Sequence, residues 1–505
     1  MKKTVLILMI VTLLSKILGF FRDIILSYYY GASFISDVYL VSITIPTVLY
    51  AMINTGIVTG FVPVFTKVEI EKGISRAKLF TNHSLNLVLI LCTGLFIVGE
   101  IFTEGIIFLF ASGFGEEAFH LAVQFTRITF VGVYLSGCIS VFFSYLQARG
   151  IFMAALMGLP ANIIIIASII ISKHLDLYML AYGALLSLVS QFILLLVMSI
   201  KQGYRYEFKL GKKNEHLKKM VGLAMPAIIG TSVSQINILI DRTLASQITE
   251  GGISALNYAN TLNTFIEGII ASSIITVLYP TISRLVAIND LKQTKEVLSM
   301  SIIGIAALVL PASAGYVVLS EPIVTFLYGR GQFDNTAILL TSSALFYYSF
   351  GLMFSTLNAL LTKTFYSLQD SKTPVLLAAI SVLANILLNF ALSPYLGIGG
   401  LALATAISNS LFTCLLFFYL SKRLGKFQAR LIKSLIKIIF CVLIMGLISN
   451  HFYDLFVYKI GSVLSLLISI FIGAISYIGL VFLVRIPEVK ETLTVVKYFN
   501  HSKVN

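Results

Sequence analysis

The stretch MLAYGALLSLVSQFILLLVMSI, residues 179–200, is a predominantly apolar run without a charged side chain. As a helix it would be about 33 Å long, enough to cross the roughly 30 Å hydrocarbon core of a bilayer. The whole 505-residue chain has the same character, with 11% charged residues and a mean hydropathy of +0.95. The apolar runs lack the alternation of a membrane β-barrel, so the backbone is expected to satisfy its hydrogen bonds as helices.

Hydropathy and the positions of glycine and proline divide the chain into about fourteen transmembrane helices, which predicts an all-α integral membrane fold. Short polar connections separate the helices, so no soluble domain is expected. The predicted segments are residues 5–28, 37–66, 81–102, 120–148, 152–172, 178–201, 219–247, 253–287, 299–319, 335–363, 374–393, 398–421, 433–450 and 461–484.

The distribution of lysine and arginine predicts the orientation of these helices, because cytoplasmic loops carry most of the positive charge. With the N-terminus inside, the cytoplasmic loops and both tails hold 29 of the 36 basic residues, and the outer loops hold only Lys173, Arg330 and Lys459. Both termini are therefore expected in the cytoplasm. The net charge of +14 follows from these basic connections and does not indicate a nucleic-acid partner.

The two halves of the chain share spaced landmarks, which predicts an internal repeat. The intervals separating Arg22, Gly31 and Asp37 recur at Arg242, Gly251 and Asn257, and two further matches lie at shifts of 222 and 223 residues. Six helices return the chain to its starting side, so the repeats are expected to be parallel. The expected parts are a six-helix lobe over 1–203, a basic cytoplasmic linker over 204–218, a second six-helix lobe over 219–424, and two extra helices with a cytoplasmic tail over 425–505.

Ionisable residues inside the predicted helices are the candidates for function. A charge facing lipid at a helix centre costs roughly 2.5–3.5 kcal/mol on insertion scales, so such residues are expected to face a polar cavity or a partner. The cations are Lys16, Arg22, Arg127 and Arg242, and the acids are Asp23, Asp37, Asp241 and Glu267.

Helical geometry predicts which of these charged residues can pair. Asp23 and Asp241 each adjoin an arginine, and since neighbours at i and i+1 do not face each other, neither pair is expected to form a local salt bridge. Arg127 is interpreted as snorkelling or pairing across helices. Glu267 has no evident partner in the sequence, and a coupling site, an ion ligand and a neutral buried acid all remain open for it.

The sequence shows no catalytic site. It contains no Walker loop, HExxH or GxSxG motif, the six histidines lack ligand spacing, and the four cysteines show neither metal-ligand spacing nor a disulfide framework. Neither an enzyme nor a metal or cofactor site is expected. Without a nucleotide site, an ion gradient, the membrane potential or substrate flux is expected to drive any transport, with an unidentified coupling cation as one partner.

Several motifs resemble the MurJ (MviN) family, in the same order from residue 1 to about 485. They are SKILGFFRD at 15–23, GA at 31–32, SD at 36–37, SQIN at 234–237, DRTLAS at 241–246, YGRGQFD at 328–334 and the most specific, FYSLQDSKTP, at 365–374. The resemblance implies two six-helix lobes with a terminal helix pair, and membership of the multidrug/oligosaccharidyl-lipid/polysaccharide exporter superfamily.

The resemblance further implies a flippase of the bacterial cytoplasmic membrane that moves lipid II, the undecaprenyl-pyrophosphate-linked peptidoglycan precursor, to the outer leaflet for cell-wall synthesis. The mechanism it implies is alternating access. Lys16, Arg22 and Asp37 match functional positions of the family, and with Arg242 they are the predicted substrate-binding residues. Predicted coupling or gating residues are Asp23, Asp241 and Glu267.

The sequence departs from the family pattern where Tyr50, Thr55 and Thr261 replace charged residues. A cavity with fewer cations leaves a second hypothesis open, a flippase for another undecaprenyl-linked polysaccharide unit. A third is a small-molecule cation antiporter using Glu267 and Asp37, although the cation-rich first helix disfavours a cationic substrate.

Overall fold

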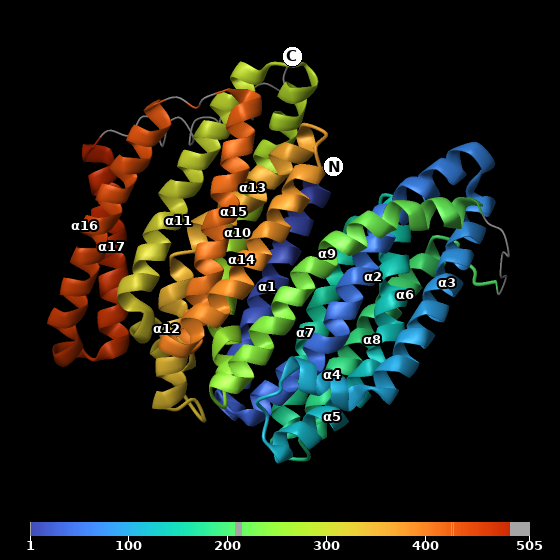
Figure 1. The fold of residues 1–505 in the computed structure, drawn as a ribbon, viewed down its shortest axis with the longest axis horizontal. Helices are drawn as coiled ribbons and strands as arrows, with labels where there is room; N and C mark the ends of the chain where they lie inside the picture. Colours follow the sequence, from blue (N-terminus) through green and yellow to red (C-terminus); the bar gives the residue numbers. More distant parts are fainter. Residues whose placement is uncertain (1, 208–214, 426, 428, 485–505) are drawn as a thin grey trace. The chain divides into compact units, whose positions relative to one another are not determined.

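The computed structural model describes residues 2–207, 215–425, 427 and 429–484, and within them every regular element is a helix. The predicted all-α fold is therefore confirmed. The chain forms two compact units, the first comprising Met1–Ser254 with Gly331–Phe333 and the second Ala255–Arg330 with Asp334–Asn505. Figure 1 follows the helices along the chain by colour.

The first unit is built around α2, which contacts helices from several parts of the sequence. It packs against α3, α5, α6 and α9, while α1 packs on α7 and α7 on α8. The helices of this unit are α1 (Lys2–Tyr30), α2 (Phe34–Lys72), α3 (Ile74–Ile101), α4 (Thr103–Phe110), α5 (Glu116–Phe130), α6 (Gly132–Ala148), the 3-10 helix η1 (Phe152–Met157), α7 (Gly158–Ser172), α8 (Tyr178–Lys201) and α9 (Glu215–Ile248).

Two glycines one helical turn apart allow α2 and α9 to pack closely. A Cβ added to Gly60 would lie 2.5 Å from the carbonyl oxygen of Met220, and one on Gly56 would lie 2.7 Å from the Ile228 side chain. Small residues at this four-residue spacing let helix backbones approach in membranes. We call this packing, formed by Gly56, Gly60, Met220, Ala224 and Ile228, the glycine contact.

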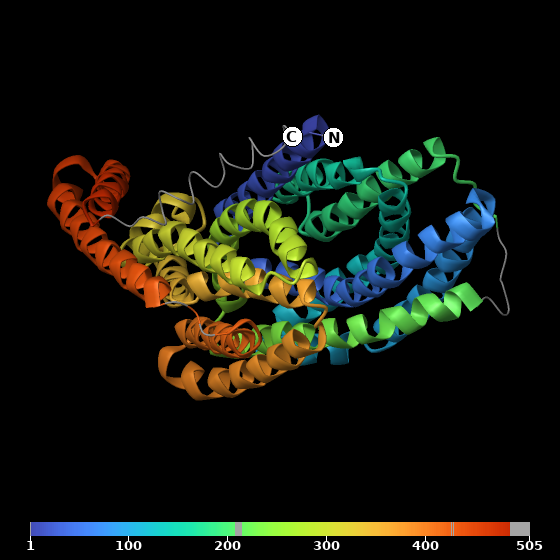
Figure 2. The same cartoon turned by 90° about the horizontal axis from the view of Figure 1, so that it is seen from above.

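The second unit contains the rest of α10 and the remaining helices. The two helices of its final pair pack against each other, and both contact α11. Figure 2 draws this final pair in red and orange-red. The helices are α10 (Gly252–Ala287, which begins in the first unit), α11 (Leu291–Tyr328), α12 (Asn335–Ser349), α13 (Leu352–Ser367), α14 (Lys372–Leu396), α15 (Ile398–Leu424), α16 (Ala429–Ile460) and α17 (Ser462–Leu483).

The span formed by α12 and α13 is broken, with a 48° bend between the two helices. Gly351 lies at the break, where an added Cβ would lie 2.8 Å from the Ala406 Cα on α15. A side chain at this position would separate the break from α15. The break therefore depends on a residue that permits close approach of the backbone.

The predicted number of fourteen spans is not confirmed. By length and composition, ten helices in the described part of the chain are able to cross a membrane, or eleven if α12 and α13 count as one. Each predicted segment overlaps a described helix or a consecutive pair, but some are short: α7 has 15 residues, fewer than the roughly 20 that a bilayer needs.

The predicted lobes stay a prediction, because they follow the sequence repeat, whereas the observed units follow contacts. The first unit extends to Ser254 because α9 packs on α2. Residues 208–214 of the expected linker and the expected tail after residue 484 lie outside the described residues.

Candidate functional site

Asp37, in the first turn of α2, binds the start of α10. Its side chain is 1% exposed, and its Oδ2 accepts a hydrogen bond from the Gly251 amide at 2.9 Å. Its Oδ1 accepts bonds from the amide and the hydroxyl of Ser254, at 2.7 and 2.6 Å. A carboxylate at a helix N-terminus satisfies amides that have no partner within the helix and complements the helix dipole. Asp37 thus caps a helix that begins more than 200 residues later.

Neighbouring groups complete this connection. The Ser36 hydroxyl donates to the Ser254 hydroxyl at 3.2 Å, and the Phe34 amide donates to Glu250 Oε1 at 3.2 Å. Gly251 has a φ of +76°, and a Cβ there would lie 2.2 Å from the Ala32 carbonyl oxygen. The turn from α9 to α10 therefore requires glycine. We call Ser36, Asp37, Gly251 and Ser254 the Asp37 cluster.

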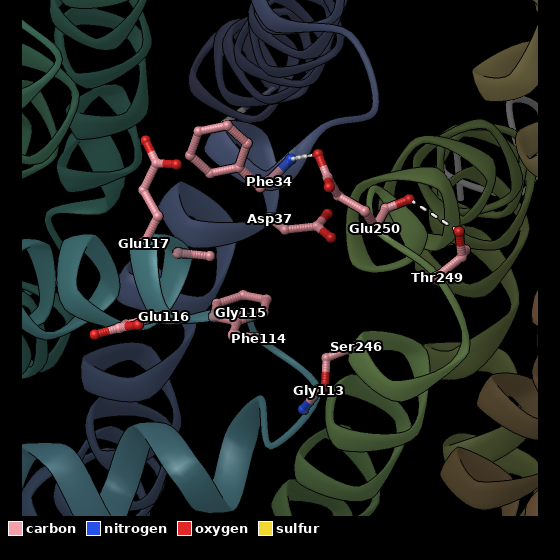
Figure 3. A pocket seen from close by; sticks show the side chains of 11 residues that line it. Phe34, Asp37, Gly113, Phe114, Gly115, Glu116, Glu117, Ser246, Thr249 and Glu250 are labelled. Carbon is pink, nitrogen blue, oxygen red and sulfur yellow. Dashed lines mark hydrogen bonds between the residues drawn. The ribbon is translucent and has the colours of Figure 1, made fainter.

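A cavity of about 270 Å³ lies beside the Asp37 cluster (Figure 3). In this view the Asp37 carboxylate points toward Glu250, which accepts the bond from Phe34. Four of the described lining residues are acidic and none is basic, so the cavity does not suit a pyrophosphate. The lining residues are Phe34, Asp37, Gly113, Phe114, Gly115, Glu116, Glu117, Ala118, Ser246, Thr249 and Glu250.

Arg242 lies near the end of α9 and binds the same connection. Its Nη1 donates to the Ile253 carbonyl at 3.2 Å, and the next residue, Ser254, donates to Asp37. The structure thus brings together two predicted site residues. Asp241, its neighbour, accepts a bond from Asn237 Nδ2 at 3.3 Å on the same helix.

Arg22 and Asp23 form a salt bridge, so the expectation that they would not pair is wrong. Arg22 donates from Nε and Nη2 to Asp23 Oδ1, at 2.9 and 2.8 Å. The guanidinium stands on a long, flexible stem and reaches around the helix to the shorter side chain. Asp23 is buried, and such a carboxylate needs a partner of this kind.

The other predicted residues lie elsewhere in the structure. Lys16 is exposed on α1, and Arg127 of α5 lies 3.9 Å from Glu100 of α3, a pair across helices. Glu267 of α10 has a partner that the sequence does not reveal: it accepts a bond from the Ser355 hydroxyl at 3.1 Å. Thr55 donates to the Ala51 carbonyl of its own helix.

Sequence reasoning did not identify Ser254 as a functional candidate. The available signal was its place three residues after Gly251, in the first turn of a helix where amides lack partners. Glu116, Glu117 and Glu250 lie outside the predicted helices, although Glu116 and Glu117 form the first turn of α5 in the structure.

Comparison with known proteins identifies the family. The family model described as "Lipid II flippase MurJ" matches residues 26–472 of this chain. The chain belongs to the MurJ family. A curated relative from Vibrio cholerae, named as a probable lipid II flippase MurJ, is 30% identical over 85% of this chain and 86% of its own length. Another, from Burkholderia cenocepacia and named lipid II flippase MurJ, is 26% identical over 82% of each chain.

Solved structures agree with this assignment. A solved structure of a lipid II flippase MurJ in an inward closed conformation matches this chain with a TM-score of 0.82 and 28% identity. The match covers 94% of this chain and 98% of the chain in that structure. An inward-facing multidrug resistance MATE family transporter of the MOP superfamily matches with a TM-score of 0.70 at 16% identity, covering 81% and 94%, which shows a shared fold. This MurJ-family chain is thus a multi-pass membrane protein of the transporter type.

Proposed function

We propose that this chain is a flippase that carries lipid II from the inner to the outer leaflet of the bacterial cytoplasmic membrane, for cell-wall synthesis. Family membership over residues 26–472 carries the proposal. The match to a MurJ in the inward closed conformation supports alternating access, since that name implies at least one other state. The protein acts by transport rather than by catalysis.

The Asp37 cluster is proposed to be the outer gate. The lysine and arginine distribution predicts that both termini lie in the cytoplasm, and with this orientation the start of α2 and the turn from α9 to α10 would lie at the outer face. Asp37 connects these two segments through three hydrogen bonds. Breaking them would free the outer end of α9 from α2 and expose the transport path to the outer side.

Lys16, Arg22 and Arg242 are proposed to bind the pyrophosphate. Asp23 engages Nε and Nη2 of Arg22, which leaves Nη1 for an anion and holds the guanidinium in place. Lys16 is exposed and supplies a point charge about 9 Å away along α1. Asp23 acts as a positioning residue for Arg22 in this proposal, and Asp241 stays a predicted coupling or gating residue.

Two assays test this proposal, one in cells and one in defined vesicles. In cells with no other lipid II flippase, depletion of this chain should stop lipid II from accumulating in the outer leaflet. In defined vesicles, the purified chain should move lipid II in preference to another undecaprenyl-linked glycan. Normal surface labelling of lipid II after depletion would contradict the proposal.

The missing charges at Tyr50, Thr55 and Thr261 favour one alternative substrate, another undecaprenyl-linked polysaccharide unit. The same vesicle assay distinguishes the two, because that alternative predicts faster movement of the other glycan.

A further inference from the structure

A proline inside α2 leaves a backbone carbonyl without its usual partner. Proline has no amide hydrogen, so the carbonyl four residues before it loses the bond that closes the helical turn, and the proline ring presses against that carbonyl. In α2, Pro46 deprives the Ser42 carbonyl in this way, and both residues are buried. Lipid offers no water to replace the bond, so another protein group is expected to donate to the Ser42 carbonyl.

The hydroxyl of Thr129, on α5, supplies the missing donor. Thr129 is buried, and its Oγ1 lies 2.7 Å from the Ser42 carbonyl oxygen. The Thr126 carbonyl lies 3.1 Å from the same hydroxyl. A hydroxyl has one hydrogen to donate, and the Ser42 carbonyl is both the nearer acceptor and the one that a proline deprives of its helical donor. Thr129 therefore completes the turn that Pro46 interrupts.

The second unit contains the same arrangement on other helices. Pro311 in α11 deprives the Ala307 carbonyl of its helical donor, and the Tyr477 hydroxyl of α17 donates to that carbonyl at 2.8 Å. A proline inside a helix usually bends it, and a neighbouring helix that donates to the freed carbonyl holds the bend in place.

Pro46 divides α2 into two arms, residues 34–45 and residues 47–72. The first arm begins with the Asp37 cluster, and the second carries Gly56 and Gly60 of the glycine contact. Asp37 lies nine residues before the proline, which is about 14 Å along the helix. A change of about 10° in the direction of the first arm would therefore move Asp37 by about 2 Å, more than a hydrogen bond tolerates. The bend at Pro46 thus decides whether Asp37 reaches the start of α10.

We propose that Thr129 is a positioning residue for the outer gate. Its hydroxyl fixes the direction of the first arm of α2 at Pro46, so that Asp37 meets the amides at the start of α10. The bond to the buried Ser42 carbonyl carries this inference. Its importance for transport rests on the proposed function, in which the Asp37 cluster opens and closes. A side chain of α5 thereby controls a contact between α2 and α10.

Amide hydrogen exchange of the purified full-length protein in detergent tests this positioning without any lipid substrate. Thr129→Val keeps the shape of the side chain and removes the hydroxyl. Peptides that contain the Gly251 and Ser254 amides should then exchange about three- to tenfold faster than in wild type, the factor that corresponds to one net hydrogen bond. Thr129→Ser, which keeps the hydroxyl, should exchange like wild type.

Two matched variants separate positioning from a general loss of stability. Thr126→Val removes a buried hydroxyl from the same helix, and this hydroxyl has no hydrogen-bond partner among the described residues. Neither the melting temperature nor the exchange at the start of α10 should suffer. Tyr477→Phe removes the equivalent hydroxyl beside Pro311, so it should lower the melting temperature and leave the exchange at the start of α10 unchanged.

A double variant separates the two effects of the Thr129 hydroxyl, satisfying a carbonyl and directing an arm. In Pro46→Ala, the alanine amide can donate to the Ser42 carbonyl within α2. Pro46→Ala combined with Thr129→Val should therefore recover the melting temperature. The exchange at the start of α10 should stay fast, because a straighter α2 no longer directs Asp37 to that helix.

Three results would overturn the positioning role of Thr129. They are equal exchange at the start of α10 in wild type and Thr129→Val, equally fast exchange there in Tyr477→Phe, or full recovery of slow exchange in the double variant. Lipid II movement measured separately in vesicles distinguishes the two proposals. Movement by wild type together with unaltered exchange in Thr129→Val would overturn this inference alone. Faster exchange in Thr129→Val of a chain that moves no lipid II would overturn the proposed function alone.

Discussion

The two ends of the packing between α2 and α9 are held by different chemistry. At one end, the Asp37 cluster connects the start of α2 to the turn after α9 and to the first turn of α10, through a buried carboxylate and directional hydrogen bonds. At the other, the glycine contact places backbone against backbone at Gly60 and Met220, with no polar group required. Hydrogen bonds to a carboxylate can be exchanged for bonds to a ligand or water, whereas close packing tolerates almost no displacement. The polar end is therefore the one expected to open during transport.

The largest effect is expected from Asp37→Ala. The substitution removes three bonds to a charged group, each worth roughly 1.5–3 kcal/mol, and leaves the Gly251 and Ser254 amides without their acceptor. Lipid II movement in vesicles should fall close to the background, with the protein still inserted. Ser254→Ala, which keeps both amide bonds, should retain most activity. Full activity in Asp37→Ala would show that the cluster is not a gate.

A smaller but still large loss is expected from Arg22→Ala. Arg22 is proposed to contact the pyrophosphate, and its removal also takes a salt bridge away from the buried Asp23. Movement should fall about a hundredfold, since charged hydrogen bonds of this kind contribute roughly 1.5–3 kcal/mol each. Arg127→Ala is the matched control, because that arginine is half-exposed and pairs with Glu100. Equal, intact activity in both variants would contradict the assignment of Arg22 to the transport path.

A substitution in the glycine contact should change the stability of the protein, because this close packing depends on shape and not on charge. In Gly60→Ala the new methyl group would lie 2.5 Å from the Met220 carbonyl oxygen, which should destabilise the protein by about 1–3 kcal/mol. Gly222→Ala on α9 is the control, because an added Cβ there meets no atom within 4 Å and alanine favours the helix by roughly 0.5–1 kcal/mol. Thermal unfolding should therefore shift in opposite directions for the two variants. A shift in the same direction would mean that the close packing is not required.

Asp370 makes hydrogen bonds similar to those of Asp37, but it lies outside the apolar segments. It accepts bonds from the amide and the hydroxyl of Thr373, as Asp37 does from Ser254, and it pairs with Arg423 at 2.6 Å. The Thr373 amide bond is the main cause that lowers the pKa of Asp370 below its usual value.

A carboxylate with a lowered pKa in the folded state stabilises the protein above its unfolded pKa, and this stabilisation is lost as the pH falls through the folded value. Wild type should lose stability below about pH 4, and Asp370→Asn should lose less over the same range. Identical pH profiles would show that Asp370 contributes nothing to stability.

The sequence predicts the fold class better than it predicts the site. Apolar runs and charge counts lead to the all-helical membrane protein, because lipid restricts the backbone to few options. The number of membrane spans is harder to predict from the sequence, because a break such as that at Gly351 depends on a contact with Ala406. Local spacing also wrongly excluded the pair of Arg22 and Asp23, because it ignores how far a guanidinium reaches.

The Asp37 cluster shows where prediction from sequence ends. The repeat drew attention to Gly251, and the family resemblance to Asp37, but nothing local joins residues that are 214 positions apart. The bond from Thr129 to the Ser42 carbonyl likewise joins residues that are 87 positions apart. The residues of each group come together only in the tertiary fold, so the sequence alone does not predict them.

A reversible cross-link across the Asp37 cluster tests the central claim most directly. The hydroxyl oxygens of Ser36 and Ser254 lie 3.2 Å apart, so cysteines at both positions can form a disulfide once the four native cysteines are replaced. Lipid II movement in vesicles should stop on oxidation and return on reduction, with neither single cysteine variant responding. Equal movement in the oxidised and reduced states, with the cross-link verified, would show that transport does not require the start of α2 to separate from the start of α10.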